Sequence, residues 1–388
     1  GRDGTLPAPA EPGQYEVRYV LQESGRSIAS APLQVTAAET SVSAPASAVA
    51  GSTVTVSWTN TIHHRDYVTI VEAGAPGDAS GDYKRVGGGN DAALPVPAEP
   101  GEYEVRYLLA KNDRALASAP LTVTTPQTSV SGPQTAVAGG RVRVSWTNVI
   151  HPRDYVTVVK ADAPPSAYND YKRAGSGNDA QLQVPAEPGE YELRYLLNKN
   201  DQPLAAAPLT VTAPEVSVSG PAEAVAGSRV TVRWDNVVHP RDYVTIVPAD
   251  AAAGAYRDYI RVGSGRDGSV EAPAQPGAYE IRYLLNVDDQ PISRAPITLT
   301  APEVSVWAPD AVEAGTRFEV SWIGTVHPRD KVTIVKADAG AEAYGDYTRV
   351  GGGTSGRLEA PEEPGTYEVR YLLNVNGKAI ARKAVKLE

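Results

Sequence analysis

Cysteine and methionine are both absent from this chain of 388 residues, and phenylalanine occurs once against 20 tyrosines. The absence of cysteine excludes disulfides, thiol catalysis and cysteine-ligated metals. No run of about 18 apolar residues occurs, so we expect no membrane-spanning segment. The net charge of -10 is spread thinly without a basic patch, which argues against a nucleic-acid partner. A signal peptide and an initiating methionine are also missing, so we expect a processed chain or a fragment.

What the sequence does contain is repetition at a constant interval of 88 residues. The phrase PGxYExRY occurs five times, and its first tyrosines are Tyr15, Tyr103, Tyr191, Tyr279 and Tyr367. A second phrase keeps the same interval through Trp58, Trp146, Trp234 and Trp322. This interval exceeds that of solenoid repeats and matches a small independent domain. The sequence therefore predicts an array of domains, each with its own core.

The strand pattern of one repeat is clear in residues 214–300. Val230, Val232 and Trp234 alternate with polar residues, as in a strand with one buried face. The phrase AYEIRYLL from Ala278 alternates in the same way. About seven short strands are separated by Pro, Gly and Asp turns, and no helical period is present. We therefore predict an all-β, rod-like tandem array of seven-stranded antiparallel sandwiches.

The two recurring aromatic positions are predicted to be structural core residues. In sandwiches of this kind a tyrosine near the start of the sixth strand hydrogen-bonds back onto the preceding corner, and PGxYExRY supplies the turn, the tyrosine and the strand. The tryptophan of the second phrase is expected to pack against the aliphatic residue two positions after that tyrosine. Such a pair would take the place of a disulfide between the sheets.

These residues carry a resemblance. VTVSWTN at Val54 together with PGEYEVRY at Pro100 is similar to the immunoglobulin and fibronectin type III superfamily. More narrowly, the combination of AGSTVTVSW, RDYVTIV, DYKRVG and PAEPGEYEVRYLL resembles the Ig-like repeats attached to von Willebrand factor A domain proteins of proteobacteria. The resemblance covers essentially the whole chain. It implies a fold and modules that serve mostly as spacers and interaction surfaces.

We expect a partial repeat followed by four complete repeats. Residues 1–36 match only the second half of a repeat, and the complete ones span 38–124, 126–212, 214–300 and 302–388. We call them the partial repeat and repeats 1 to 4. The joins are about two residues long and three of the four carry proline, which favours a stiff array. Repeat 4 departs from the others and is expected to be a C-terminal cap; we prefer that the partial repeat is the tail of a further upstream domain, with completion by another chain as the alternative.

A His-x-Arg-Asp segment recurs in each repeat and has two interpretations. One is a metal or pH-sensing site; the other, which we favour, is a loop that its Asp side chain caps. One histidine recurs per repeat, without a second ligand at metal spacing. The recurring Arg and Asp side chains are also possible interface residues; they are Arg65, Asp66, Arg153, Asp154, Arg241, Asp242, Arg329 and Asp330. Trp307 replaces a serine in repeat 4, and we expect it to brace that repeat, or else to meet a neighbouring chain.

No recurrent Ser/His/Asp set or distinctive carboxylate pair is present, so we expect no enzyme, no catalytic residues, no cofactor and no metal site. The first prediction of function is a bacterial structural protein, part of an extracellular filament or cell-surface stalk. The alternative is an adhesin or ligand-binding module that recognises a protein or a glycan at the cell surface. The expected partners are further copies or upstream domains of the same protein, with a surface protein or glycan as a second possibility. Calcium at the joins is conceivable, but the joins hold few carboxylates.

Overall fold

The computed structural model describes residues 3–175 and 177–388, so residues 1 and 2 of the partial repeat and residue 176 of repeat 2 lie outside it. Every regular element in the described residues is a β-strand, which confirms the all-β prediction. No helix in this described part has the length and apolar character needed to cross a membrane. Contacts divide the chain into two compact units. The first holds the partial repeat, repeat 1 and most of repeat 2, and the second holds the rest of repeat 2 with repeats 3 and 4.

The partial repeat is a single antiparallel hairpin of β1 (Gly13–Val20) and β2 (Ser27–Val35). Its side chains are far more open than those of the same strands in repeat 1. Val17 and Tyr19 are 43% and 66% exposed, whereas the corresponding Val105 and Tyr107 are fully buried. The difference arises because the hairpin forms a sheet of its own two strands, without the facing sheet that covers these positions in repeat 1.

Each complete repeat contains eight strand segments in the same order. Repeat 1 has β3 (Val42–Ser43), β4 (Ser47–Val49), β5 (Thr53–Trp58), β6 (Tyr67–Glu72), β7 (Tyr83–Arg85), β8 (Asp91–Pro95), β9 (Gly101–Leu108) and β10 (Ala115–Thr124). Repeat 2 has β11 (Val130–Ser131), β12 (Thr135–Val137), β13 (Arg141–Trp146), β14 (Tyr155–Lys160), β15 (Tyr171–Arg173), β16 (Asp179–Gln183), β17 (Gly189–Leu196) and β18 (Pro203–Thr212).

Repeats 3 and 4 follow the same plan. Repeat 3 has β19 (Val218–Ser219), β20 (Glu223–Val225), β21 (Arg229–Trp234), β22 (Tyr243–Pro248), β23 (Tyr259–Arg261), β24 (Asp267–Glu271), β25 (Gly277–Leu284) and β26 (Pro291–Thr300). Repeat 4 has β27 (Ser305–Trp307), β28 (Ala311–Val312), β29 (Arg317–Ile323), β30 (Lys331–Lys336), β31 (Tyr347–Arg349), β32 (Ser355–Glu359), β33 (Gly365–Leu372) and β34 (Ala379–Leu387).

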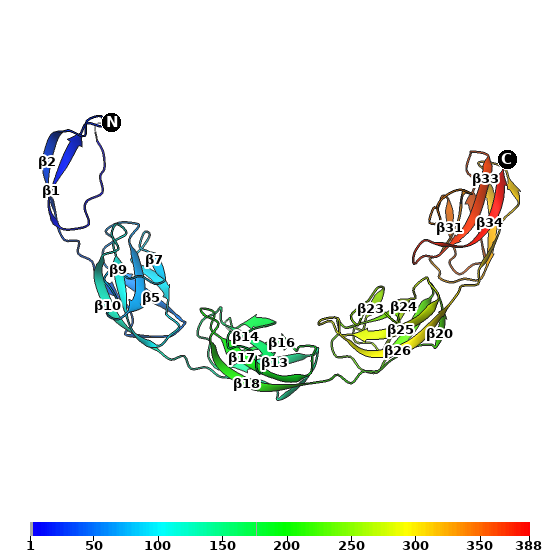
Figure 1. The fold of residues 1–388 in the computed structure, drawn as a ribbon, viewed down its shortest axis with the longest axis horizontal. Coiled ribbons are helices and arrows are strands. Elements are labelled where there is room, and N and C mark those ends of the chain that lie inside the picture. Colours follow the sequence, from blue (N-terminus) through cyan, green and yellow to red (C-terminus); the bar gives the residue numbers. More distant parts are fainter. Residues whose placement is uncertain (1–2, 176) are drawn as a thin grey trace. The chain divides into compact units, whose positions relative to one another are not determined.

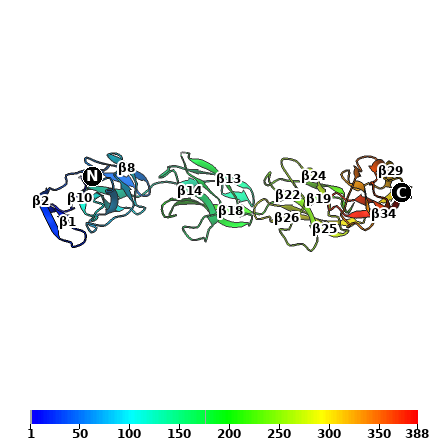
Figure 2. The same cartoon turned by 90° about the horizontal axis from the view of Figure 1, so that it is seen from above.

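The strands of each repeat form two sheets, as the labelled strands in Figure 1 and the turned view in Figure 2 illustrate. In repeat 3 the smaller sheet has the order β19-β21-β24 and the larger one β20-β26-β25-β22-β23. The first of the seven predicted strands is split: β19 pairs antiparallel with β21, whereas β20 pairs parallel with β26 in the other sheet. Proline 221 lies between these two segments, where a strand without a ladder N–H is free to change sheets.

The core of each repeat lies between its two sheets, and Trp234 and Ile281 belong to one buried cluster in repeat 3. The corresponding pairs are Trp58 with Val105 in repeat 1 and Trp322 with Val369 in repeat 4. The sequence suggested a cross-sheet pair of an indole with an aliphatic side chain, and in these three repeats both members belong to the same buried cluster. Burial of such large apolar side chains is the main driving force for a domain of this size.

Candidate functional site

The His-x-Arg-Asp segment forms a loop that is closed by its own aspartate. In repeat 3 the carboxylate of Asp242 accepts hydrogen bonds from the backbone N–H of His239 at 2.8 Å and of Asn286 at 2.8 Å. It also accepts one from the hydroxyl of Tyr283 at 3.0 Å. The same three bonds occur in repeats 1, 2 and 4 around Asp66, Asp154 and Asp330. Since both carboxylate oxygens are already bonded, this aspartate connects two loops and is unsuited to bind a ligand.

The histidine of the loop is held in one tautomer. The backbone N–H of Arg241 donates to Nδ1 of His239 at 3.1 Å, and the corresponding bond is present in the other three repeats. Because Nδ1 accepts, the proton of the neutral ring lies on Nε2, which is then a donor and has no lone pair for a metal. Within the described residues there is no group of three or more His, Cys, Asp or Glu side chains arranged to hold a metal ion.

Burial of this loop changes the pKa values of its groups. Desolvation raises the pKa of Asp154, Asp242 and Asp330, and the hydrogen bonds that each carboxylate accepts oppose that rise. Desolvation also raises the pKa of the partner Tyr107 to about 12. The pKa of His239 is lowered, first by desolvation and then by the nearby Arg141. In repeat 3 burial therefore favours the neutral form of His239.

This loop lies next to the contact between consecutive repeats, which we call a joint. A leucine of each following repeat rests against a glycine of the preceding one. A Cβ on Gly139, whose φ is +76°, would come within 2.7 Å of the Leu285 side chain. In the same way, a Cβ on Gly51 would come within 2.7 Å of the Leu197 side chain, and a Cβ on Gly227 within 3.2 Å of the Leu373 side chain. Glycine is required here both for its positive φ and for the close approach of the leucine.

The polar contacts differ between joints. The ammonium of Lys111 donates to the carbonyl of Ala8 at 2.9 Å, and that of Lys199 donates to the carbonyl of Val96 at 3.2 Å. Lys199 also forms an ion pair with Asp82 at 2.8 Å. At the joint between repeats 3 and 4 the corresponding residue is Val375, so the lysine contact is missing there and Asn374 instead donates to Glu271 at 3.4 Å. The feature shared by the three joints between complete repeats is thus the leucine on the glycine, and the polar contacts are particular to each.

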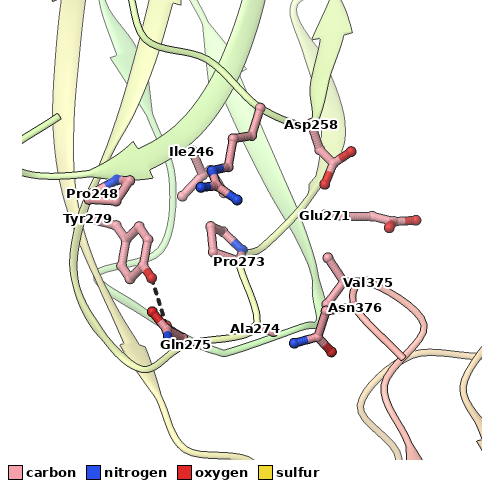
Figure 3. Close-up of a pocket in the computed structure, with 11 residues that line it drawn as sticks. Ile246, Pro248, Asp258, Glu271, Pro273, Ala274, Gln275, Tyr279, Val375 and Asn376 are labelled. Atoms are coloured by element: carbon pink, nitrogen blue, oxygen red, sulfur yellow. Dashed lines mark hydrogen bonds between the residues drawn. The ribbon is translucent and has the colours of Figure 1, made fainter. Parts of the chain in front are cut away.

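A cleft of about 570 Å³ lies at the joint between repeats 3 and 4. Figure 3 shows the side chains of Asp258, Glu271 and Asn376 at this cleft, with Pro273 beside them. Arg257 also lines it. These groups can exchange hydrogen bonds with a polar molecule, but none of them is a nucleophile placed next to a base.

His327 lies at the same joint and is almost fully buried. Its Nε2 is 3.6 Å from Oε1 of Glu271 and has no hydrogen-bond partner among the described residues. The other oxygen of Glu271 accepts a bond of 3.4 Å from the amide of Asn374. At 3.6 Å the histidine nitrogen and the carboxylate oxygen lie just beyond hydrogen-bond distance, so the two groups interact only as close polar neighbours.

A second group of partly exposed side chains is formed by tyrosines beside the edge strands β15 and β23. In repeat 2 Tyr155, Tyr168 and Tyr171 lie with ring centroids 5.3 to 5.8 Å apart, and the ring of Tyr168 is perpendicular to that of Tyr171. The outer two rings are 52% and 41% exposed. The hydroxyl of Tyr155 donates to Asp201 at 2.7 Å, which fixes the innermost ring.

The same arrangement recurs with changes in the other repeats. Repeat 3 contains Tyr243, Tyr256 and Tyr259, with the guanidinium of Arg261 over two of these rings. In repeat 4 Lys331 replaces the innermost tyrosine, and its ammonium lies 4.6 and 4.7 Å from the centroids of the two remaining rings. Each of these clusters thus offers aromatic faces beside polar side chains, a combination suited to binding a ligand with both apolar and polar surfaces.

The remaining residues that were singled out in the sequence lie as follows. The tryptophans of the second phrase are 2–4% exposed. Their indole N–H groups donate to Thr61 Oγ1 in repeat 1 and to a glycine carbonyl of the turn before β16, β24 or β32 in the others. The tyrosine hydroxyl of PGxYExRY donates to the carbonyl four residues earlier at Tyr15, Tyr103, Tyr279 and Tyr367. The loop arginines, such as Arg153, are exposed, and Trp307 is 57% exposed.

Reasoning from the sequence missed the role of the arginine in the phrase PGxYExRY. Arg282 alternates with the core residues of β25, a pattern typical of a residue that faces solvent, yet it is fully buried. Its guanidinium donates to the carbonyls of Ala251 and Ala252 at 3.0 and 2.6 Å and to Glu280 at 2.9 Å. The corresponding residues Arg106, Arg194 and Arg370 do the same. The sequence feature that could have revealed this role is the Glu-x-Arg spacing, which is the same in all five copies of the phrase.

The chain is similar in fold to several solved structures. No protein family matches the chain, and no curated protein matches it. Among solved structures, the Escherichia coli adhesin FdeC is 21% identical, with 69% of this chain and 98% of that chain covered and a TM-score of 0.20. The bacterial integrin-binding protein invasin is 9% identical, with 90% and 79% covered and a TM-score of 0.20. The immunoglobulin domains 1–5 of Sidekick-1 are 11% identical, with 88% and 78% covered and a TM-score of 0.21.

The strand order, with one sheet of three strands and one of five joined by a split first strand, defines a tandem array of immunoglobulin-like sandwiches. This assignment rests on the topology and not on the low-scoring likenesses.

Proposed function

We propose that the chain is a non-enzymatic structural protein, a bacterial cell-surface stalk or part of an extracellular filament, in which the repeats act as spacers of defined geometry. The observation that carries the proposal is the recurrent joint, in which a leucine of one repeat rests on a positive-φ glycine of the repeat before it. A flexible string of domains has no need of a constant packed contact between its members. The resemblance of the sequence to repeats attached to von Willebrand factor A domain proteins supports the same role.

The joint is tested by comparing two glycine substitutions with the same local strain. Gly139→Ala and Gly315→Ala each place an alanine at a φ of +76° or +73°. Only the first brings a Cβ within 2.7 Å of a leucine of the next repeat, since the nearest atom to the second is 4.0 Å away. We expect Gly139→Ala to reduce the maximum dimension in solution X-ray scattering and to speed hydrogen exchange of residues 285–290. Equal behaviour of the two variants would contradict a spacer that depends on its joints.

A second candidate function, ligand binding at the cell surface, is favoured by the exposed tyrosine clusters. If repeats 2 and 3 grip a glycan, a protein carrying Tyr168→Ser and Tyr256→Ser should lose binding in a glycan array while keeping its unfolding temperature. Serine is the natural residue at this place in repeat 1, Ser80, so the substitution is compatible with the fold. Absence of any glycan signal from the unmodified protein would leave the spacer role as the better account.

A further inference from the structure

The tyrosine cluster of repeat 4 differs in charge from those of the other repeats. In repeat 3 the hydroxyl of the innermost ring, Tyr243, donates to the carboxylate of Asp289 at 2.5 Å, and the same bond is present in repeats 1 and 2. In repeat 4 Lys331 stands in place of that tyrosine and Gly377 in place of that aspartate. An ammonium without a carboxylate thus replaces a hydroxyl that is bonded to one.

A second cation lies directly opposite this lysine. Arg349 on the edge strand β31 pairs with Lys331 in the ladder between β30 and β31, so both side chains leave the same face of the sheet. It is the outer face, because the alternate residues Val332 and Val350 belong to the core. In repeats 1 to 3 the corresponding arginine is opposite a tyrosine. Like charges at opposite positions destabilise a sheet, so repeat 4 departs from the common pattern at a cost.

Neither of the two cations has an ion-pair partner among the described residues. In repeat 3 Arg261 donates to a loop carbonyl and to an asparagine, whereas the guanidinium of Arg349 makes neither bond in the part of the chain that the structure describes. The adjacent acids, Asp330 and Asp346, already accept hydrogen bonds from backbone N–H groups. The ammonium of Lys331 lies over two tyrosine rings, which attract a cation but carry no net charge. A negative group from outside the repeat would compensate both charges.

The rings beside these cations are open to solvent. Tyr344 and Tyr347 are 60% and 41% exposed, and their planes stand at 85° with centroids 6.1 Å apart. The apolar face of a sugar ring can pack on an aromatic face while an acidic substituent of the sugar reaches the cations. A sugar ring is rigid and loses little conformational freedom on binding, whereas an acidic peptide must also order its backbone. The combination of flat rings and cations therefore favours an acidic saccharide.

We propose that Lys331, Arg349, Tyr344 and Tyr347 form a binding site for an acidic saccharide, whose sugar rings carry carboxylate or sulfate groups. The guanidinium can present two parallel N–H donors to such a group, and the ammonium donates to it from beside the rings. Repeats 1 to 3 keep the tyrosine and the aspartate at the two exchanged positions, so the site belongs to repeat 4. The inference goes beyond the spacer role, and it adds a preference for negative charge that the tyrosine clusters of repeats 2 and 3 do not share.

The test is isothermal titration calorimetry of the full chain with a hexamer of galacturonic acid and with its methyl ester, which has the same rings without the charges. A sulfated galactose hexamer shows whether sulfate or carboxylate binds more tightly. The variant carries Lys331→Tyr and Gly377→Asp, the residues of repeats 1 to 3 at these places, so it is expected to fold. We expect the methyl ester, and the acidic hexamers with this variant, to bind at least about tenfold more weakly, because each charged hydrogen bond contributes that much.

Two single changes separate the site from general charge attraction. Arg349→Gln should weaken binding to the same extent and tests the site even if the double variant unfolds. The control Arg317→Gln removes an arginine that is 77% exposed on the other sheet of repeat 4, and it should leave the affinity unchanged. The proposal is overturned if neither acidic hexamer binds at millimolar concentration, if the ester binds as tightly, or if Arg349→Gln binds as tightly as the unmodified protein. Equal binding of hexaglutamate would also overturn it, in favour of an acidic peptide. The spacer role has its own test at Gly139 and does not depend on these results.

Discussion

The buried arginine of each repeat gives the sharpest test of what holds the sandwich together. In repeat 3 the guanidinium of Arg282 is fully buried and donates to two loop carbonyls and to Glu280. Replacing it by methionine keeps a long unbranched side chain and removes every donor. Ala251 and Ala252 would then lose the partner of their carbonyls, and Glu280 would lose its closest counter-charge. Breaking a buried ion pair in this way costs about 3–5 kcal/mol.

The same carboxylate supplies a matched control. Arg294 also faces Glu280, at 3.5 Å, but its side chain is 45% exposed. An exposed ion pair is worth about 0–1 kcal/mol, so Arg294→Met should barely change the stability of repeat 3. Arg282→Lys is informative as well, because an ammonium keeps the charge but cannot present the fork of donors that reaches two carbonyls and a carboxylate. It should fall between the other two variants.

The assay is calorimetric unfolding of the full chain, with hydrogen exchange to locate the change in residues 214–300. For a domain of this size 1 kcal/mol shifts the unfolding temperature by about 4–8 °C. Arg282→Met should therefore lower the transition of repeat 3 by about 12 °C or more and leave the other transitions unchanged. If Arg282→Met and Arg294→Met lower it equally, the buried guanidinium is not what orders the loop, and the reasoning fails.

Three further predictions concern the core, the loop and its pH dependence. Trp146→Ala should cost repeat 2 about 3–5 kcal/mol, and near-unchanged calorimetric unfolding would remove the tryptophan from the core. Tyr283→Phe strips one hydrogen bond from Asp242 and should cost about 1–2 kcal/mol in denaturant unfolding, with protection lost at both loops. Since the folded-state pKa of His239 is lowered, repeat 3 is fully stabilised above the unfolded pKa of about 6.5 and loses stability as pH falls from there through the folded pKa. His239→Asn, which keeps an acceptor for the loop N–H, should flatten that dependence in thermal melts between pH 7 and 5; an unchanged slope would assign it to other groups.

The features of the fold that could be read from the sequence are those with strict spacing. The interval of 88 residues shows which positions are equivalent in the repeats. The alternation at Val230, Val232 and Trp234 predicts that these side chains share one face of a strand, and in the structure all three belong to the core of repeat 3. The split of the first strand was not readable in the same way. It depends on a proline and on a parallel pairing of β20 with β26, in which Glu223 pairs with Thr298, and local patterns carry no information on such a distant contact.

The buried arginine shows why the polar half of the core was harder to predict. Alternation assigns Arg282 to the outer face of β25, and an arginine there is ordinarily solvated. The structure covers that face with the loop between β22 and β23, whose carbonyls need donors because the loop is rich in alanine and offers few side chains of its own. The requirement is set by a segment distant in sequence. It becomes visible only once the loop and the strand are seen together.

The positions that stabilise the fold of each repeat differ from those that are available to contact a partner. The loop aspartate, the buried arginine and the joint glycine recur in every complete repeat, because each satisfies a constraint that the fold imposes on all copies. The tyrosine clusters and the exposed side chains of Trp307 and Ile323 in repeat 4 vary from copy to copy, and no packing constraint demands their apolar exposure. In an array derived from one ancestral unit, a residue that departs from its counterparts while increasing exposed apolar area is better explained by something outside the repeat. A partner is therefore expected to contact Trp307 and Ile323, and not the invariant His-x-Arg-Asp loop, whose aspartate is already fully hydrogen-bonded.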